Sequence, residues 1–313
     1  MKKNKILVIG SSGQIGTDLC LSLERMYGAE NIIRSDLNPA KEKNHYKNFI
    51  ELDVLDNEML TRKVKEENIS EIYLLAASLS ALAEKNVLVS CELNMNSLIN
   101  VLELARKKII KKIFWPSSIA VFGPDSPKLN TPQNTILNPS SIYGITKLSG
   151  EKLCKYYYDK FDVDIRSLRL PGLIGWRSLA GGGTTDYAVE IFYYALKNND
   201  YTCFLSKETI LPMMYMDDAI EAILKIMTTK KENIKIRTSY NISAVSFTPK
   251  ELEKQIKIYL PNFNVKFKPD YRQKIADSWP DSIDDREAKV DWGWKAKFNL
   301  EKLTSEMFKN LSN

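Results

Sequence analysis

The stretch Lys5-Ile6-Leu7-Val8-Ile9-Gly10-Ser11-Ser12-Gly13-Gln14-Ile15-Gly16 decides the fold. Residues 6–9 are apolar without polar alternation, which is typical of a strand buried on both faces. The three glycines follow at once, and an amphipathic helix is predicted from Gln14 to Tyr27. Such a turn lets the backbone approach a pyrophosphate at the positive end of a helix dipole. The pattern predicts a dinucleotide site at Gly10, Gly13, Gln14, Ile15 and Gly16; the alternative is a plain structural turn.

Short apolar runs alternate with amphipathic ones through residue 170. Further strands are predicted at 31–34, 49–52, 71–75, 112–115 and 163–168, with helices at 57–67, 87–107 and 141–160. This order predicts an α/β fold, a Rossmann-type doubly wound parallel sheet with helices on both faces. After Pro171-Gly172 the glycines cluster, aromatic residues become frequent and the alternation loosens. We therefore expect a dinucleotide-binding domain at 1–170, with a return around 212–245, and a smaller substrate-binding lobe at 171–211 and 246–313.

Composition narrows the function. The 313 residues are 44% hydrophobic, and their 45 Lys and Arg are interspersed with 39 Asp and Glu, which does not predict nucleic-acid binding. No apolar run approaches the roughly 20 residues of a membrane span, and the run after the basic start is too short for a secretory signal. The four cysteines are scattered, and His45 is the single histidine. We expect a cytoplasmic protein with free thiols, without a bound metal and without a histidine-based triad.

An acidic residue follows the second strand. Asp36 lies 20 residues beyond Gly16, where a carboxylate can bind the adenosine ribose hydroxyls and repel a 2′-phosphate. This favours NAD, although Arg34 nearby leaves NADP open. Asp53, just past the third strand, is a candidate partner for the adenine amino group. Either aspartate can instead cap a helix.

Tyr143 and Lys147 have the YxxxK spacing, which places both side chains on one helix face. The same spacing occurs at Tyr156 to Lys160, but only Tyr143 follows a strand ending in Ser117-Ser118. A lysine ammonium beside a tyrosine stabilises the phenolate and lowers the tyrosine pKa. The phenolate can then remove a hydroxyl proton as hydride leaves for a nicotinamide. Ser118 would hold the substrate oxygen, and Lys147 can also bond the nicotinamide ribose. The alternative is an exposed helical pair beside a turn serine.

These motifs resemble the extended short-chain dehydrogenase/reductases, the family of UDP-galactose 4-epimerase, over nearly the whole chain. The glycine turn, Asp36 and the Ser118–Tyr143–Lys147 set carry the resemblance. Ser118 rather than Ser117 matches the family position, because Phe122-Gly123 closes the run. Besides Asp53, the resemblance adds four residues on the cofactor side, namely Val54, Ala76, Ala77 and Asn94.

The second half resembles the zinc-independent L-threonine 3-dehydrogenases within that family. The matching runs are Gly181-Gly182-Gly183-Thr184-Thr185-Asp186-Tyr187-Ala188, residues 211–219, Arg272 to Pro280 and 282–285. The resemblance implies oxidation of the L-threonine 3-hydroxyl by NAD to 2-amino-3-oxobutyrate, which leads to glycine or aminoacetone. It also implies a homodimer through the helices at 87–107 and 141–160.

For the substrate, we expect contacts from Ser80, from the N–H groups and hydroxyls of Gly183, Thr184 and Thr185, and from the charge of Arg177. The triple glycine can instead be a flexible loop, and Trp279 is expected to be a packing residue. Two alternative functions remain: a nucleotide-sugar epimerase or dehydratase of the same fold, and a non-enzymatic NAD-sensing protein that needs the glycine turn but not Tyr143.

Overall fold

β1 (Lys5–Ile9) lies inside a seven-stranded sheet, which is why its side chains are apolar on both faces. The computed structural model describes residues 5–37, 48–179 and 181–312, so His45 lies outside the described residues. All strands of this main sheet are parallel, in the order β10-β6-β5-β4-β1-β2-β3. The other strands are β2 (Ile32–Asp36), β3 (Phe49–Glu51), β4 (Ile69–Leu74), β5 (Lys112–Ser118), β6 (Asp164–Leu170) and β10 (Tyr240–Asn241). The predicted Rossmann-type α/β fold is confirmed.

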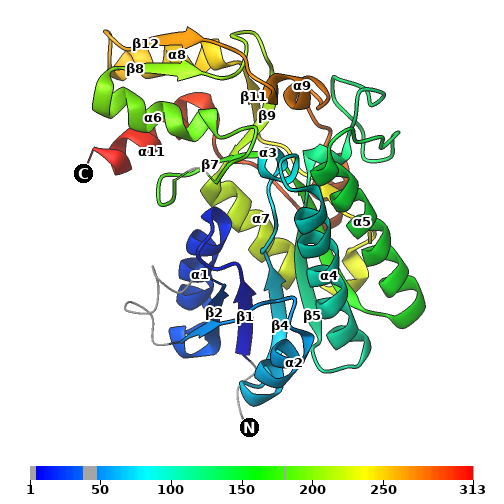
Figure 1. The fold of residues 1–313 in the computed structure, drawn as a ribbon. Helices are drawn as coiled ribbons and strands as arrows, with labels where there is room; N and C mark the ends of the chain where they lie inside the picture. The colour runs from blue at the N-terminus through cyan, green and yellow to red at the C-terminus, as the bar shows by residue number, and fades with distance from the viewer. Residues whose placement is uncertain (1–4, 38–47, 180, 313) are drawn as a thin grey trace.

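Helices cover both faces of the main sheet (Figure 1). Alternate side chains of β1 point to opposite faces, so Ile6 and Val8 join one buried cluster while Leu7 and Ile9 join the other. The first cluster includes side chains of α1 (Gln14–Tyr27) and α7 (Met216–Thr228). The second includes side chains of α2 (Asn57–Glu66), α4 (Val87–Arg106) and α5 (Ile142–Phe161). The helix positions predicted from the sequence agree with these bounds to within one residue.

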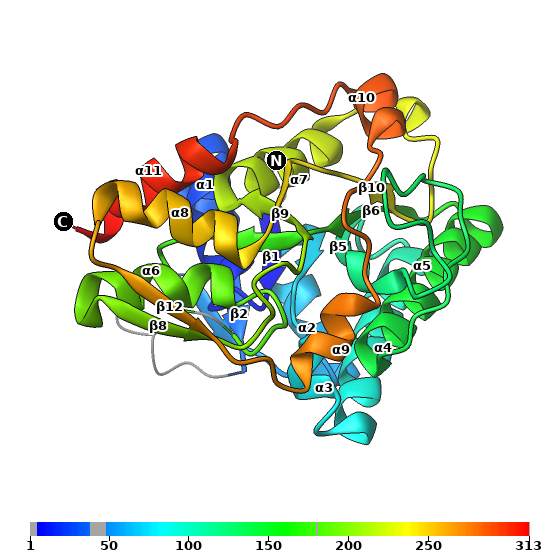
Figure 2. The ribbon, with the colours of Figure 1, turned by 90° about the horizontal axis from the view of Figure 1, so that it is seen from above.

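A smaller lobe lies above the end of the main sheet to which the β1 arrow points (Figure 1). Figure 2 shows α6, α8 and α11 gathered on one side of the molecule, with α4 and α5 on the other. A third buried cluster fills the lobe and includes Tyr187, Phe192 and Met307. Its strands pair as β11-β9-β7 and β12-β8. The bounds are β7 (Gly172–Ile174), β8 (Asp200–Cys203), β9 (Leu211–Tyr215), β11 (Val245–Phe247), β12 (Asn264–Phe267), α6 (Tyr187–Asn198), α8 (Pro249–Tyr259), α9 (Arg272–Asp277) and α11 (Leu300–Leu311).

The chain returns from the lobe to the main sheet twice. After β9, α7 packs on the main sheet, and β10 then pairs with β6 at its edge. A second return falls in 246–313, which we assigned entirely to the lobe. There, α10 (Arg286–Trp292) brings Trp292 into edge-to-face contact with Tyr240 of β10, at 5.9 Å between ring centroids. Large aromatic side chains cover the short edge strand, so this part of the assignment is corrected.

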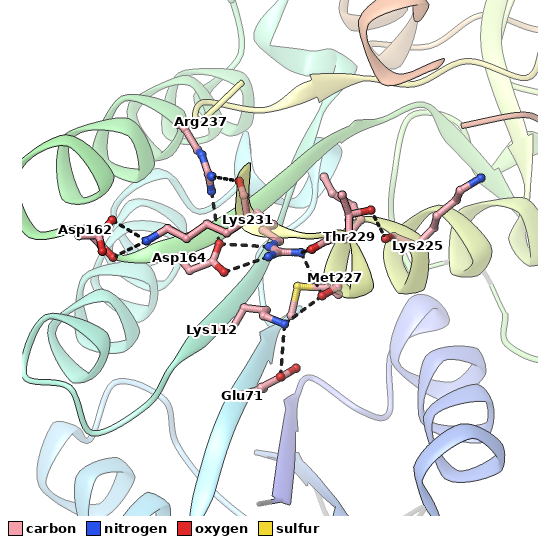
Figure 3. A network of polar contacts seen from close by, with 11 residues as sticks. Glu71, Lys112, Asp162, Asp164, Lys225, Met227, Thr229, Lys231 and Arg237 are labelled. Atoms are coloured by element: carbon pink, nitrogen blue, oxygen red, sulfur yellow. Dashed lines mark hydrogen bonds and ion pairs between the residues drawn. The ribbon is translucent and has the colours of Figure 1, made fainter. Parts of the chain in front are cut away.

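A network of charged side chains joins the start of β6 to the C-terminus of α7, at the end of the main sheet opposite the lobe (Figure 3). Arg166 of β6 donates to the carbonyls of Ile226, Met227 and Thr229 at 2.5, 3.0 and 2.6 Å. These carbonyls lie at the C-terminus of α7, where a helix has no backbone donors left and carries partial negative charge. Asp164 accepts two bonds from the same guanidinium, at 3.1 and 2.9 Å. The network therefore anchors α7 to β6.

Replacing Arg166 by methionine should lower the free energy of unfolding by about 3–5 kcal/mol, because it leaves the helix carbonyls without their buried donor and Asp164 with Arg237, at 3.3 Å, as its remaining cationic partner among the described residues. Urea unfolding followed by circular dichroism measures this loss. Arg286→Met is the matched control, since Arg286 and Asp284 form an ion pair whose arginine is 78% exposed. Equal effects of the two substitutions would contradict the anchoring role.

Candidate active site

The turn between β1 and α1 leaves no room for side chains at two of its glycines. Gly10 has φ +87°, and a Cβ there would lie 2.7 Å from the Ala76 backbone nitrogen at the end of β4. A Cβ on Gly16 would lie 2.2 Å from the Gly10 carbonyl oxygen. Gly13 is the N-cap of α1, and no side chain caps this helix end. The first N–H groups of α1 are therefore open to an anionic ligand such as a pyrophosphate.

Asp36 ends β2 beside this turn. Its carboxylate accepts the Ser12 N–H at 3.1 Å and the Leu37 N–H at 2.9 Å. The Ser12 hydroxyl and the Gln14 amide nitrogen are buried without a partner among the described residues. Buried polar groups normally have partners, so this pair indicates a polar ligand at the turn. The turn, the open helix end and the carboxylate together fit a dinucleotide.

One pocket of about 1100 Å³ runs from the glycine turn to the lobe, at the carboxyl ends of the parallel strands. Ligands bind at this edge in open α/β sheets. The pocket brings together every site residue predicted from the sequence except Asn94: it is lined by Gly10, Gly13, Gln14, Ile15, Gly16, Asp36, Asp53, Val54, Ala76, Ala77, Ser80, Ser118, Tyr143, Lys147, Arg177, Gly183, Thr184 and Thr185.

The side chains of Asn94 and Asp53 accept hydrogen bonds from nearby backbone N–H groups. The Asn94 amide accepts the Ser78 N–H at 2.8 Å and donates to the Thr146 hydroxyl at 3.1 Å. It therefore ties the loop after β4 to α5 and does not reach the pocket. One Asp53 oxygen accepts the Leu55 N–H at 2.9 Å, in the turn before α2, while the residue itself lines the pocket.

The trio Ser118, Tyr143 and Lys147 meets where β5 ends and α5 begins. Ser141 caps α5, with its hydroxyl accepting the Gly144 N–H at 3.1 Å, and so sets where the helix starts. The Lys147 ammonium donates to the Pro116 carbonyl at 2.6 Å and lies 5.5 Å from the centre of the Tyr143 ring. Tyr143 shares a hydrogen bond with the Ser118 hydroxyl.

Burial dominates the protonation of this trio. It raises the pKa of Tyr143 to about 12, against a smaller lowering by the Ser118 hydrogen bond. It also lowers the pKa of Lys147 to about 7. We expected Lys147 to bring the tyrosine pKa down, and in the protein alone it does not. A lysine that is only partly charged at neutral pH contributes little field.

The backbone N–H groups of Gly182, Gly183 and Thr184 already have acceptors within the protein. The Asp186 carboxylate accepts the N–H groups of Gly182 and Gly183, both at 2.7 Å. The Thr184 N–H donates to the Ser80 hydroxyl at 3.1 Å. The expectation that the N–H groups of Gly183 and Thr184 bind a substrate carboxylate is therefore wrong for this conformation, because protein oxygens already occupy them.

Arg177 is tied to the nucleotide side of the pocket. Its guanidinium pairs with Asp18 of α1 at 2.5 Å and lies 4.2 Å from the centre of the Trp176 ring. A substrate carboxylate would have to share this arginine with Asp18. Trp279, which we expected only to pack, lines the pocket although it is 4% exposed.

Sequence reasoning also missed several apolar wall residues: Leu79, Leu82 and Leu173 line the same pocket. Positions 79 and 82 carried no motif, and only the fold brings them over Gly181 and Gly182. Within the described ranges, no three His, Cys, Asp or Glu side chains gather in a way that could hold a metal ion. Over the same ranges, no helix combines the length and apolar character that crossing a bilayer requires.

Comparison with known proteins agrees with this geometry. An uncharacterized epimerase/dehydratase of Staphylococcus haemolyticus is 44% identical over 308 residues, covering 97% of this chain and 96% of the relative. The holo structure of a GalE-like L-threonine dehydrogenase from Cupriavidus necator has a TM-score of 0.96 and 47% identity, covering 98% of this chain and 99% of that one. A monomeric L-threonine 3-dehydrogenase from a metagenome database has a TM-score of 0.95 and 49% identity, with 98% of each chain covered.

The family model of NAD dependent epimerases and dehydratases matches residues 6–243, from β1 to just beyond β10. This range includes the glycine turn, Asp36 and the trio. The chain therefore belongs to the NAD dependent epimerase/dehydratase family, and its cofactor is NAD.

Proposed function

We propose that the chain is an L-threonine 3-dehydrogenase, which oxidises the 3-hydroxyl of L-threonine to 2-amino-3-oxobutyrate. The observation that carries this proposal is the position of the trio, which faces the glycine turn across one pocket while the 181–186 loop and Trp279 form the lobe side. The similarity to two structures titled as L-threonine dehydrogenases supports the choice of substrate.

The chemistry needs one hydride acceptor and one base. Bound NAD supplies the acceptor for the hydride that leaves C3 of the substrate. Tyr143 takes the hydroxyl proton at its phenolate oxygen, and the Ser118 hydroxyl holds the substrate oxygen. Because burial raises the pKa of Tyr143 to about 12, the charged form of Lys147 is needed to stabilise the phenolate at neutral pH.

Several polar side chains of the pocket suit an amino acid. Ser80 and Thr185 place hydroxyls at the pocket wall, and Arg177 contributes positive charge. Asp186 contributes negative charge, and burial raises the pKa of its carboxyl. An ammonium ion beside this carboxylate would offset that cost. We propose that these side chains bind the two charged groups of L-threonine.

The pocket fits a nucleotide sugar less well. A second pyrophosphate needs cations, and the cationic residues among the described lining are Lys147 and Arg177. Lys147 belongs to the trio and donates to the Pro116 carbonyl, so Arg177 alone among these lining residues would remain for the two negative charges of a second pyrophosphate. An NAD sensor would require the glycine turn but not the trio of Ser118, Tyr143 and Lys147. Both alternatives are therefore disfavoured.

We also propose that two copies associate through α4 and α5, which lie side by side (Figure 1). Apolar side chains on the outer surface of these helices are open to solvent in the single chain. Leu88 is 84% exposed and Val89 65%, and Ile145 on α5 is also exposed. Burying such a surface against a second copy would remove apolar area from water.

Purified protein should reduce NAD rapidly with L-threonine and should not turn over UDP-sugars, as followed by the absorbance of reduced nicotinamide and a product assay. Tyr143→Phe should lower turnover by about 10²–10⁴ because the base is lost, and leave NAD affinity within about twofold. Tyr156→Phe is the matched control, since Tyr156 has the same spacing to Lys160 but is exposed. Turnover of a UDP-sugar instead of L-threonine would overturn the proposed substrate.

Asp36→Ala should raise the KM for NAD about tenfold, because charge-assisted bonds to the ribose hydroxyls are lost. It should also reduce discrimination against NADP, since the repulsion of the 2′-phosphate disappears. The ratio of kcat/KM for the two cofactors measures this. Asp53→Ala is the control and should weaken both cofactors alike. An unchanged ratio in the Asp36 variant would reject the assigned role.

Sedimentation equilibrium should give about twice the chain mass for the wild type. Leu88→Glu should shift the protein toward the monomer, because a carboxylate would be desolvated in the contact. Leu129→Glu replaces an equally apolar side chain, 68% exposed but outside both helices, and should leave the mass unchanged. A monomeric wild type would reject the association.

A further inference from the structure

A buried ion pair lies directly behind the trio, one helical turn beyond Lys147. The Glu151 carboxylate accepts two bonds from the Arg169 guanidinium, at 2.9 and 2.8 Å, and one from the Ser117 hydroxyl at 2.7 Å. The side chains of the pair are 1% and 3% exposed. Figure 2 shows β5 and β6, which carry Ser117 and Arg169, close to α5. The proposed mechanism uses none of these three side chains.

Ser117 connects this pair to the trio. It stands between Pro116, whose carbonyl accepts the Lys147 ammonium, and Ser118, which shares a hydrogen bond with Tyr143. Its own hydroxyl is held by Glu151. The carboxylate therefore fixes the strand segment that contacts both ionisable members of the trio.

Arg169 has a second set of partners. Its guanidinium donates to the Gln133 carbonyl and the Asn241 side-chain oxygen, both at 3.1 Å. The arginine is therefore held in place without Glu151. Removing only the glutamate charge would leave a buried, uncompensated positive charge on Arg169, which contacts residue 151 one helical turn from Lys147. A like charge disfavours the ammonium form.

The titratable and charged groups around Lys147 come from four elements. On α5 they are Tyr143, Glu151 and Cys154, and β6 adds Arg169. Glu84, at the end of the short helix α3 (Ser80–Ala83), accepts the Ile142 N–H at the start of α5. Glu103 of α4 binds Tyr157 farther along α5. Burial lowers the pKa of Lys147, and the charge of Glu151 opposes that lowering. Burial raises the pKa of the Cys154 thiol, so Cys154 is uncharged at neutral pH.

We propose that Glu151 is a positioning residue for the trio, and that its buried carboxylate favours the ammonium form of Lys147 against the effect of burial. The proposal rests on the proposed function in one step only, the stabilisation of the Tyr143 phenolate by the charged Lys147. Glu151 itself contacts neither substrate nor cofactor. It acts through Lys147 and through the backbone beside Ser117.

The charge of Lys147 can be measured without cofactor or substrate. In protein labelled with carbon-13 lysine, the Cε resonance that titrates near neutral pH is assigned by its loss in Lys147→Met. Glu151→Gln should lower its titration midpoint by about one pH unit. Glu103→Gln removes a carboxylate elsewhere on the α4–α5 pair and should leave the midpoint unchanged. An unchanged midpoint in Glu151→Gln would overturn the proposal.

A second variant, for which the opposite shift of the midpoint is expected, tests the proposal if Glu151→Gln does not fold. Arg169→Met leaves the carboxylate without its counter-charge and should raise the midpoint. The double variant Glu151→Gln with Arg169→Met leaves neither charge and should lie between the two single variants. Midpoints that move in the same direction in both single variants would show a general loss of packing and would reject an electrostatic role.

The pH profile of turnover tests the catalytic consequence separately. With L-threonine, the high-pH limb of kcat should move to lower pH in Glu151→Gln, because Lys147 loses its proton earlier. The KM for NAD should stay within about twofold of wild type. A uniform fall in kcat with unchanged limbs would reject the link to catalysis. If the wild type does not oxidise L-threonine, the proposed function fails, while the resonance measurement still decides the role of Glu151.

Discussion

The fold depends on the contact between residue 16 and the Gly10 carbonyl. A Cβ at residue 16 would lie 2.2 Å from that oxygen, so only glycine lets α1 begin this close to the end of β1. This contact sets where the N–H groups at the start of α1 point, and therefore where a pyrophosphate can bind. Gly10 adds a second constraint, since its left-handed backbone brings the turn against Ala76. The cofactor end of the pocket follows from these two backbone approaches.

The end of the pocket that holds the proposed catalytic trio is built differently, from buried charge. Three charged side chains, Lys147, Glu151 and Arg169, are almost completely buried. Lys147 donates to the Pro116 carbonyl of β5, and Glu151 accepts from Arg169 of β6. These hydrogen bonds replace the water that each charge has lost. Such an arrangement is costly when any one member is missing, so the three act as a unit. The charged network around Arg166 at the other end of β6 follows the same rule, although it supports α7 rather than a site.

Local sequence patterns were sufficient to predict the main sheet. The first strand, the glycine turn and the helices α1, α2, α4 and α5 carry the apolar periodicity or glycine spacing from which they were predicted. Long-range pairing was not readable: the partners of Arg177 and Asn94 are Asp18 and Ser78, and neither pairing has a signal in the sequence. Trp279 was assigned to packing because nothing around it shows that 279 and 118 share a pocket.

The pKa of Tyr143 shows why a motif alone does not describe a mechanism. Spacing placed Lys147 beside the tyrosine, and from that we expected a lowered phenol pKa. Burial acts on both groups in opposite directions: it favours the neutral phenol and the neutral amine. Excluding water from a site for hydride transfer therefore also favours neutral Lys147, although the Tyr143 phenolate needs the charged form. Another buried charged group has to offset this effect. Glu151 is placed to do so, because its charge opposes the effect of burial on Lys147 from one helical turn away.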